Sequence, residues 1–141
     1  MPSPTVLTLK RLRDHAWVSQ VVEQTIRGAG VVFHRDLFSC IDVLAIRHVP
    51  RPRILGVQAC IMGHVRARLD KAKGFAVELD KHGEPRKPPA LAEWLKAGGE
   101  FQVWGFAKRG PRGERKRWVC RRVGIAVDKG TGNFVETALE G

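Results

Sequence analysis

Two apolar stretches decide the fold, and each of them has one polar side chain in its interior. The first is Ile41-Asp42-Val43-Leu44-Ala45-Ile46-Arg47, and the second is Ile54-Leu55-Gly56-Val57-Gln58-Ala59-Cys60-Ile61. Short and nearly continuous apolar runs of this kind predict strands that are buried on both faces of a sheet. The segment between them, Val49-Pro50-Arg51-Pro52-Arg53, predicts a loop, because proline cannot donate a hydrogen bond within a central strand.

A long helix is predicted before this pair of strands, and further helices and strands follow it. Residues 8–27 place apolar side chains at helical spacing with Thr8 as N-cap, and residues 31–34 predict a short strand. The downstream pattern predicts, in turn, a helix over 64–73, a polar proline-rich excursion over 77–89, a short helix over 91–95, and strands over 101–106 and 117–123 that form a hairpin around a basic turn. This order favours a single mixed α/β domain over 1–141, with a core at about 8–125 and a peripheral tail at 126–141.

Composition and charge narrow the class of partner. The chain has a formal net charge of +11 and a pI of about 10.5, so we expect it to bind a polyanion, either nucleic acid or an anionic membrane surface. The membrane is disfavoured, because no apolar run approaches the roughly 20 residues that span a bilayer and the N-terminus has no signal-peptide pattern. The cysteines Cys40, Cys60 and Cys120 form no C-x-x-C pair, so neither a zinc knuckle nor a disulfide framework is indicated. A reducing, cytoplasmic compartment is expected.

Asp42 and Gln58 are the polar side chains that the two central strands would bury. A lone buried carboxylate costs several kcal/mol unless a metal or a cation compensates it, so Asp42 is a candidate metal ligand; a structural salt bridge or an exposed edge position is the alternative. Gln58 shares its strand face with Cys60, because side chains alternate. Oxygens of Asp42, Gln58 and the Ala59 backbone carbonyl would suit Mg²⁺, which keeps much of its water shell. A core amide satisfied by its neighbours is the alternative for Gln58.

Five further side chains could contribute to such a site. Glu23 borders the apolar stripe of the first predicted helix and could reach the same pocket or stay solvated. Asp36 lies in a connection, where a turn role is equally plausible. The second predicted helix presents His64, Arg68 and Lys71 on one face. Those cations could clamp a phosphodiester and stabilise its developing charge, or they could simply face solvent.

The basic hairpin gives the strongest binding signal in the sequence. Eight cations fall within fifteen residues against one acid, Glu114, and they are Lys108, Arg109, Arg112, Arg115, Lys116, Arg117, Arg121 and Arg122. Guanidinium groups pair with phosphates bidentately, and the flanking indoles of Trp104 and Trp118 could stack on bases or simply pack. An ordinary solvated face would mix the two signs of charge. The hairpin is therefore predicted to bind nucleic acid with a steep dependence on salt.

These segments, taken as a series, resemble the small phage and bacterial PD-(D/E)XK nucleases that are described as Holliday-junction-resolvase-like. The resemblance covers residues 10 to about 125 and rests on Arg35-Asp36-Leu37-Phe38-Ser39-Cys40-Ile41-Asp42-Val43-Leu44-Ala45-Ile46, Ile54-Leu55-Gly56-Val57-Gln58, Arg68-x-x-Lys71, Trp94-Leu95-x-x-Gly98-Gly99 and Val103-Trp104-Gly105-Phe106-x-Lys108. It implies a restriction-endonuclease-like αβββαβ core, with a mixed central sheet flanked by helices and an added C-terminal basic hairpin. It also implies Mg²⁺- or Mn²⁺-dependent cleavage of branched or duplex DNA, and a homodimer would suit a four-way junction.

The resemblance also assigns roles within the site. It makes Asp42 the metal-binding Asp, Gln58 the acidic-or-Gln residue of the third strand, and Glu23 the helix acid. The usual catalytic lysine is replaced by Cys60, and a thiol cannot act as a cationic phosphate clamp; Lys71 is the best substitute and Arg68 the next. Two functions on this fold stay open: a metal-dependent DNA endonuclease, and a nucleic-acid-binding protein with little or no cleavage. A basic protein that binds an acidic protein partner is a third.

Overall fold

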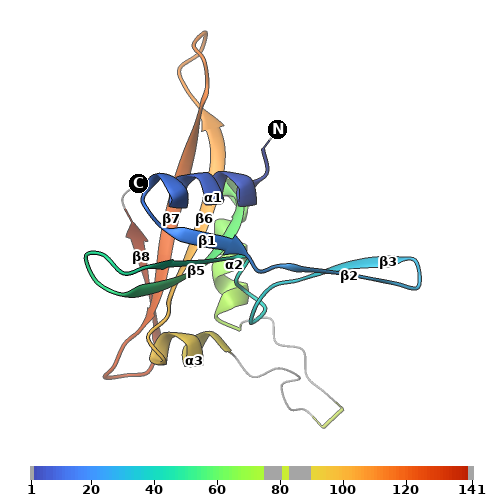
Figure 1. Cartoon of the computed structure of the whole chain (residues 1–141), viewed down its shortest axis with the longest axis vertical. Helices are drawn as coiled ribbons and strands as arrows, with labels where there is room; N and C mark the ends of the chain where they lie inside the picture. Colours follow the sequence, from blue (N-terminus) through green and yellow to red (C-terminus); the bar gives the residue numbers. More distant parts are fainter. Residues whose placement is uncertain (1, 75–80, 83–89, 140–141) are drawn as a thin grey trace.

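A computed structural model describes residues 2–74, 81–82 and 90–139, and these form one six-stranded sheet, a separate two-stranded ribbon and flanking helices (Figure 1). The elements are α1 Pro4–Asp14, β1 Val18–Val21, β2 Gln24–Gly28, β3 Val31–Arg35, β4 Val43–Arg47, β5 Arg53–Ile61, a 3₁₀ turn Met62–His64, α2 Val65–Ala72, α3 Ala90–Lys96, β6 Glu100–Arg109, β7 Arg117–Val127 and β8 Phe134–Leu139. The excursion predicted over 77–89 lies, apart from residues 81 and 82, outside the described residues.

The six-stranded sheet has the order β1-β4-β5-β6-β7-β8, and β5 with β6 is the one parallel pair among its described strands. Strands β1, β4 and β5 form an antiparallel meander, and the β2–β3 ribbon is inserted between β1 and β4. The connection from β5 to β6 passes through α2 and α3, because parallel strands need a crossover. The prediction of an α/β fold with a mixed central sheet flanked by helices is confirmed.

The two faces of the sheet are covered by different helices. On one face, which we call the α1 face, Leu12 of α1 packs in a cluster with Val57 and Trp104. On the other, the α2 face, Leu69 of α2 and Leu91 of α3 belong to a second buried cluster. Burying each leucine stabilises the fold by roughly 1.5–3 kcal/mol relative to leaving it in water. Strand alternation therefore tells which face each functional side chain occupies.

The prediction of one helix over residues 8–27 is wrong, and Glu23 is not on a helix. Helix α1 ends at Asp14, and Ala16 has a left-handed backbone with φ 63° that helical residues avoid. The chain then returns as β1, which pairs with β4, and continues into β2. Residues 18–27 are rich in β-branched side chains, so pairing with the sheet outweighs a periodicity that also fits a helix.

The start of α1 also differs from the prediction. Ser3, rather than Thr8, is the N-cap, and its side-chain oxygen accepts a hydrogen bond from the Val6 N–H at 3.2 Å. Thr8 lies fully buried within the helix. None of the helices in the described part of the chain has the length and apolar character needed to cross a bilayer.

The predicted peripheral tail contains a strand of the sheet. A turn held by Asp128, whose carboxylate accepts from the N–H groups of Gly130 and Thr131 at 2.8 and 3.0 Å, leads into β8 at the sheet edge. Glu136 of β8 forms ion pairs with Arg66 of α2 and with Lys73 just beyond it. Because of these pairs, β8 is tied to the helix layer as well as to β7.

Candidate functional site

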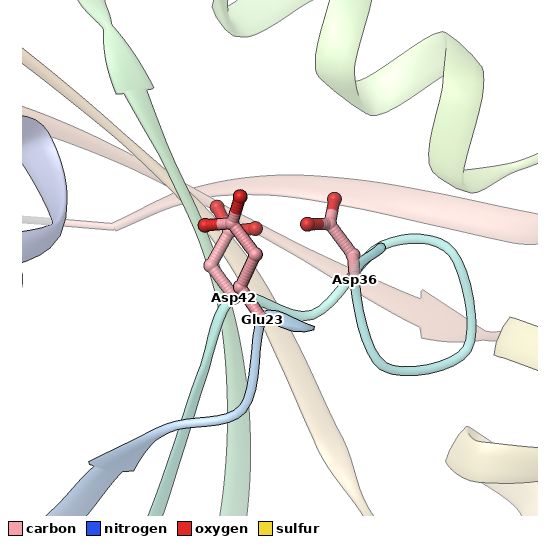
Figure 2. Close-up of side chains that lie close together, drawn as sticks. All are labelled: Glu23, Asp36 and Asp42. Carbon is pink, nitrogen blue, oxygen red and sulfur yellow. The ribbon is translucent and has the colours of Figure 1, made fainter. Parts of the chain in front are cut away.

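Three carboxylates meet where the β2–β3 ribbon joins the sheet. Glu23 directly precedes β2, Asp36 directly follows β3, and Asp42 directly precedes β4. One ligand oxygen from each lies within 4.8 Å of the others, and Figure 2 shows the three side chains gathered from separate segments. The group could hold a metal ion, because carboxylate oxygens are preferred ligands of hard divalent cations.

The backbone of Asp42 locks this residue between two strands. Its N–H donates to the Val57 carbonyl at 2.9 Å, and its carbonyl accepts from the Val22 N–H at 2.8 Å. The bend at Asp42 thus extends the pairing of β4 with β5 and of β1 with β4 by one step. Its position is consequently fixed by the centre of the meander.

A tight loop brings Asp36 back toward Asp42. Leu37 and Ile41 exchange backbone hydrogen bonds of 2.9 Å and form an isolated bridge. Between them, Phe38 and Ser39 have left-handed φ angles of 52° and 64°. Such angles are unfavourable for residues other than glycine, and they persist only where the surrounding structure enforces them. The bridge is what enforces them here.

Asp42 is 5% exposed, and its carboxylate is held by donors from β5. Its Oδ2 accepts from Gln58 Nε2 at 2.7 Å and from the Ala59 N–H at 3.0 Å. Gln58 and Ala59, both predicted as metal ligands, therefore contact the cluster as hydrogen-bond donors to Asp42. These two bonds orient the carboxylate, and this is the role that outer-shell groups play around metal ligands.

Electrostatics at this group favour a bound cation. The pKa of Asp42 is raised to about 8, chiefly by burial and also by the hydrogen bond with Asp36 and the charges of Asp36 and Glu23, while the bond from the Ala59 N–H opposes the rise. Carboxylates that share a site cannot all ionise without mutual repulsion. A divalent cation would remove this repulsion, so the donor set fits such an ion.

The buried thiols of Cys60 and Cys40 each have a cation nearby, and these cations are Arg68 and Lys71. Burial raises the pKa of Cys60 to about 11, and the charge of Arg68 acts against that rise. Burial likewise raises the pKa of Cys40 to about 12, and Lys71 acts against it. Arg68, which is half-buried, is thus close to Cys60, whereas the exposed Lys71 is close to Cys40. Both thiols stay protonated near neutral pH and are poor nucleophiles.

Strand alternation divides the predicted basic hairpin between the two faces of the sheet. The hairpin of β6 and β7 extends well beyond the sheet in Figure 1. On the α2 face, which also carries Gln58 and Cys60, lie Arg109, Arg117 and Arg121, here called the basic strip. Lys108 and Arg122 lie on the α1 face over the rings of Trp118 and Trp104, at 5.3 and 5.6 Å from the ring centroids. Arg112, Arg115 and Lys116 lie in the exposed connection at the tip, and His64 is exposed just before α2.

Asp36 is the member of the carboxylate group to which the sequence assigned no metal-binding role. A turn residue and a metal ligand have the same local pattern, since both favour a carboxylate in a short connection. No local signal distinguishes the two, because the contact of Asp36 with Asp42 depends on how the chain folds back between them. Comparison with protein-family models, with curated proteins and with solved structures gives no match for this chain. What the site can do therefore follows from its own residues.

Proposed function

We propose that this chain is a metal-dependent DNA endonuclease that acts at the Glu23, Asp36 and Asp42 group. The observation that carries the proposal is a buried carboxylate, Asp42, placed against two others and oriented by a buried amide. These three carboxylates would hold Mg²⁺, or Mn²⁺ in its place. When bound, such an ion supplies Lewis acidity and lowers the pKa of a coordinated water.

The order of elements supports a restriction-endonuclease-like core. Helix α1, the meander β1-β4-β5, helix α2 and strand β6 follow the order αβββαβ, with the ribbon and α3 as additions. The first of these three strands is β1, whereas the strand predicted over residues 31–34 is β3 of the ribbon. Asp42 stands at the start of the second strand of that series, and Gln58 lies in the third. Both positions are those expected for the PD-(D/E)XK family.

Three sets of protein groups would have separate roles around the scissile phosphate. Gln58 and Ala59 hold Asp42 in one orientation and so keep the ligand oxygens in place. Arg68 supplies positive charge beside Cys60, where it would stabilise the charge that develops on the phosphate. The basic strip lies on the same face of the sheet and would position the DNA backbone.

Loss of the Arg68 charge is expected to slow cleavage more than loss of the Lys71 charge. Arg68→Gln should reduce the single-turnover rate at least about tenfold, because it removes the cation at the missing-lysine position, whereas Lys71→Gln should have a smaller effect. Arg68→Lys keeps the charge and should restore part of the rate. Equal losses for Arg68→Gln and Lys71→Gln, or the reverse order, would contradict this assignment.

Removing charge from the basic strip is expected to weaken DNA binding and its salt dependence. The double variant Arg117→Gln, Arg121→Gln should lower the slope of log Kd against log salt by about 2, since each phosphate contact contributes roughly one. Fluorescence anisotropy with labelled duplex DNA over a range of salt measures the slope. The matched control removes two exposed cations of α1, Lys10 and Arg13, and should keep the wild-type slope.

A DNA-binding protein without cleavage is the second candidate, and Cys60 at the lysine position favours it. Wild-type protein incubated with linear, nicked and four-way-junction DNA separates the two candidates. The endonuclease proposal requires that Mg²⁺ or Mn²⁺ produce cuts that a chelator suppresses. Binding of all three substrates without any metal-dependent cutting would assign the chain to the second candidate.

A further inference from the structure

A second polar site lies on the α1 face, across the sheet from the three carboxylates. It is a pocket of about 290 Å³ between α1, the segment after it and strands β4 to β7. Its lining brings together four arginines from four elements, namely Arg11 of α1, Arg47 of β4, Arg53 of β5 and Arg122 of β7. Within the part of the chain that the structure describes, this lining has no aspartate or glutamate.

Two of these guanidinium groups are fixed in place by aromatic stacking and hydrogen bonds. Arg47 and Arg53 lie 4.4 and 4.9 Å from the centroid of the Trp17 ring. Arg47 also donates to the His15 carbonyl at 3.0 Å, and Arg53 makes two bonds of 2.7 and 2.8 Å to Glu100 just outside the lining. If the negative charge of Glu100 is subtracted from the charges of the four arginines, the formal charge around the pocket is still positive. Arg47 and Arg53 are thus held in place before any ligand arrives, which lowers the entropic cost of binding.

The pocket also shows the electrostatic cost of gathering like charges. The pKa of Arg122 is lowered, first by burial and also by the charge of Arg11. The Nε of Arg47 is buried and has no hydrogen-bond partner among the described residues. Both conditions are unfavourable for a charged donor removed from water. A bound anion would offset the repulsion between Arg11 and Arg122.

We propose that this pocket binds a phosphate group, supplied either as free orthophosphate or at the end of a nucleic-acid strand. A phosphate offers three acceptor oxygens and a double negative charge, which match several planar guanidinium groups at once. The pocket volume falls just below the roughly 300–1,000 Å³ typical of sites for drug-sized ligands, so it suits a small anion. The site goes beyond the proposed cleavage, because the sheet separates it from the carboxylate group.

Calorimetric titration of the full chain with sodium phosphate, at constant ionic strength, tests this site. Wild-type protein should bind phosphate, and the double variant Arg11→Gln, Arg122→Gln should bind at least about tenfold more weakly, since two charge-assisted contacts are lost. The control removes Lys96 and Lys129, two exposed cations outside the pocket lining and outside the basic hairpin, and should bind as wild type. If Arg122→Gln impairs folding, Arg11→Gln alone should still weaken binding, and Arg11→Lys should recover part of it.

Three results would overturn the proposal: no phosphate binding by the wild type at millimolar concentration, unchanged binding in the Arg11→Gln variant, or equal loss in the Lys96 and Lys129 control. An oligonucleotide with a 5′-phosphate, compared with the same strand ending in a hydroxyl, identifies the source. Tighter binding of the phosphorylated strand assigns the pocket to strand ends, and equal binding assigns it to free phosphate. Asp42→Asn should leave phosphate binding unchanged, which separates this site from the proposed cleavage.

Discussion

Asp42→Asn is expected to reduce metal-dependent DNA cleavage by about a thousandfold. The substitution keeps the shape of the side chain and removes the charge at the centre of the carboxylate group. A metal contributes several kcal/mol of charge stabilisation to phosphodiester cleavage, and about 4 kcal/mol corresponds to this factor. Single-turnover cleavage of a labelled substrate, with Mg²⁺ and separately with Mn²⁺, gives the rate.

Two further measurements make the Asp42→Asn result specific. The variant should bind DNA with nearly unchanged affinity, because the basic strip is intact, while its affinity for Mn²⁺ falls. Asp14→Asn, at an exposed carboxylate at the end of α1, serves as the matched control and should cleave as wild type. Retention of more than about a tenth of the wild-type rate by Asp42→Asn would mean that the carboxylate group is not the cleavage site.

The metal-free protein is expected to lose stability as pH rises from about 5 to about 8, with a total change of a few kcal/mol. The pKa of Asp42 in the folded state is about 8, above its ordinary value of 3.8, so the fold favours the neutral carboxyl. The contribution of Asp42 is therefore fully present below pH 4 and is lost as pH rises through about 8. Urea unfolding in the presence of a chelator, at several pH values in this range, measures it.

The direction of this pH effect distinguishes Asp42 from other carboxylates. The pKa of Glu136 is lowered to about 2 by hydrogen bonds from Arg66 and Lys73, so its contribution is present above pH 4.5 and is lost only in stronger acid. Asp42→Asn should flatten the decline between pH 5 and 8, because asparagine does not titrate. Added Mg²⁺ should stabilise the wild type more at pH 8 than at pH 5. If the free energy of unfolding changes with pH in the same way in the wild type and in Asp42→Asn, burial does not raise the pKa of Asp42 as described.

The central part of the fold could be predicted because its signals are local. Strands β4 and β5 stand out as apolar runs separated by prolines, and the polar residues that stand out are Asp42, directly before β4, and Gln58 within β5. Helix α2 and the β6–β7 hairpin follow from periodicity and turn composition. In each case the residues that decide the element are neighbours in the chain.

The failures arise where long-range pairing decides the structure. Residues 18–27 have an apolar spacing that fits a helix, and only pairing with β4 and β3 makes them strands. The meeting of Glu23 with Asp36 depends on closure of the ribbon, which no local pattern reveals. The phosphate pocket likewise draws its arginines from four elements that become neighbours through sheet order.

The ribbon of β2 and β3 has a consequence that follows from where it is attached. It projects away from the sheet in Figure 1. Glu23 directly precedes β2 and Asp36 directly follows β3, so the two residues lie at the base of the ribbon. An isolated two-stranded ribbon is marginally stable in water. A cation bound by both Glu23 and Asp36 would act as a cross-link that restricts the conformational freedom of the ribbon. By thermodynamic reciprocity, a ligand that orders the ribbon would then raise the affinity for the cation by the same factor by which the cation raises the affinity for that ligand.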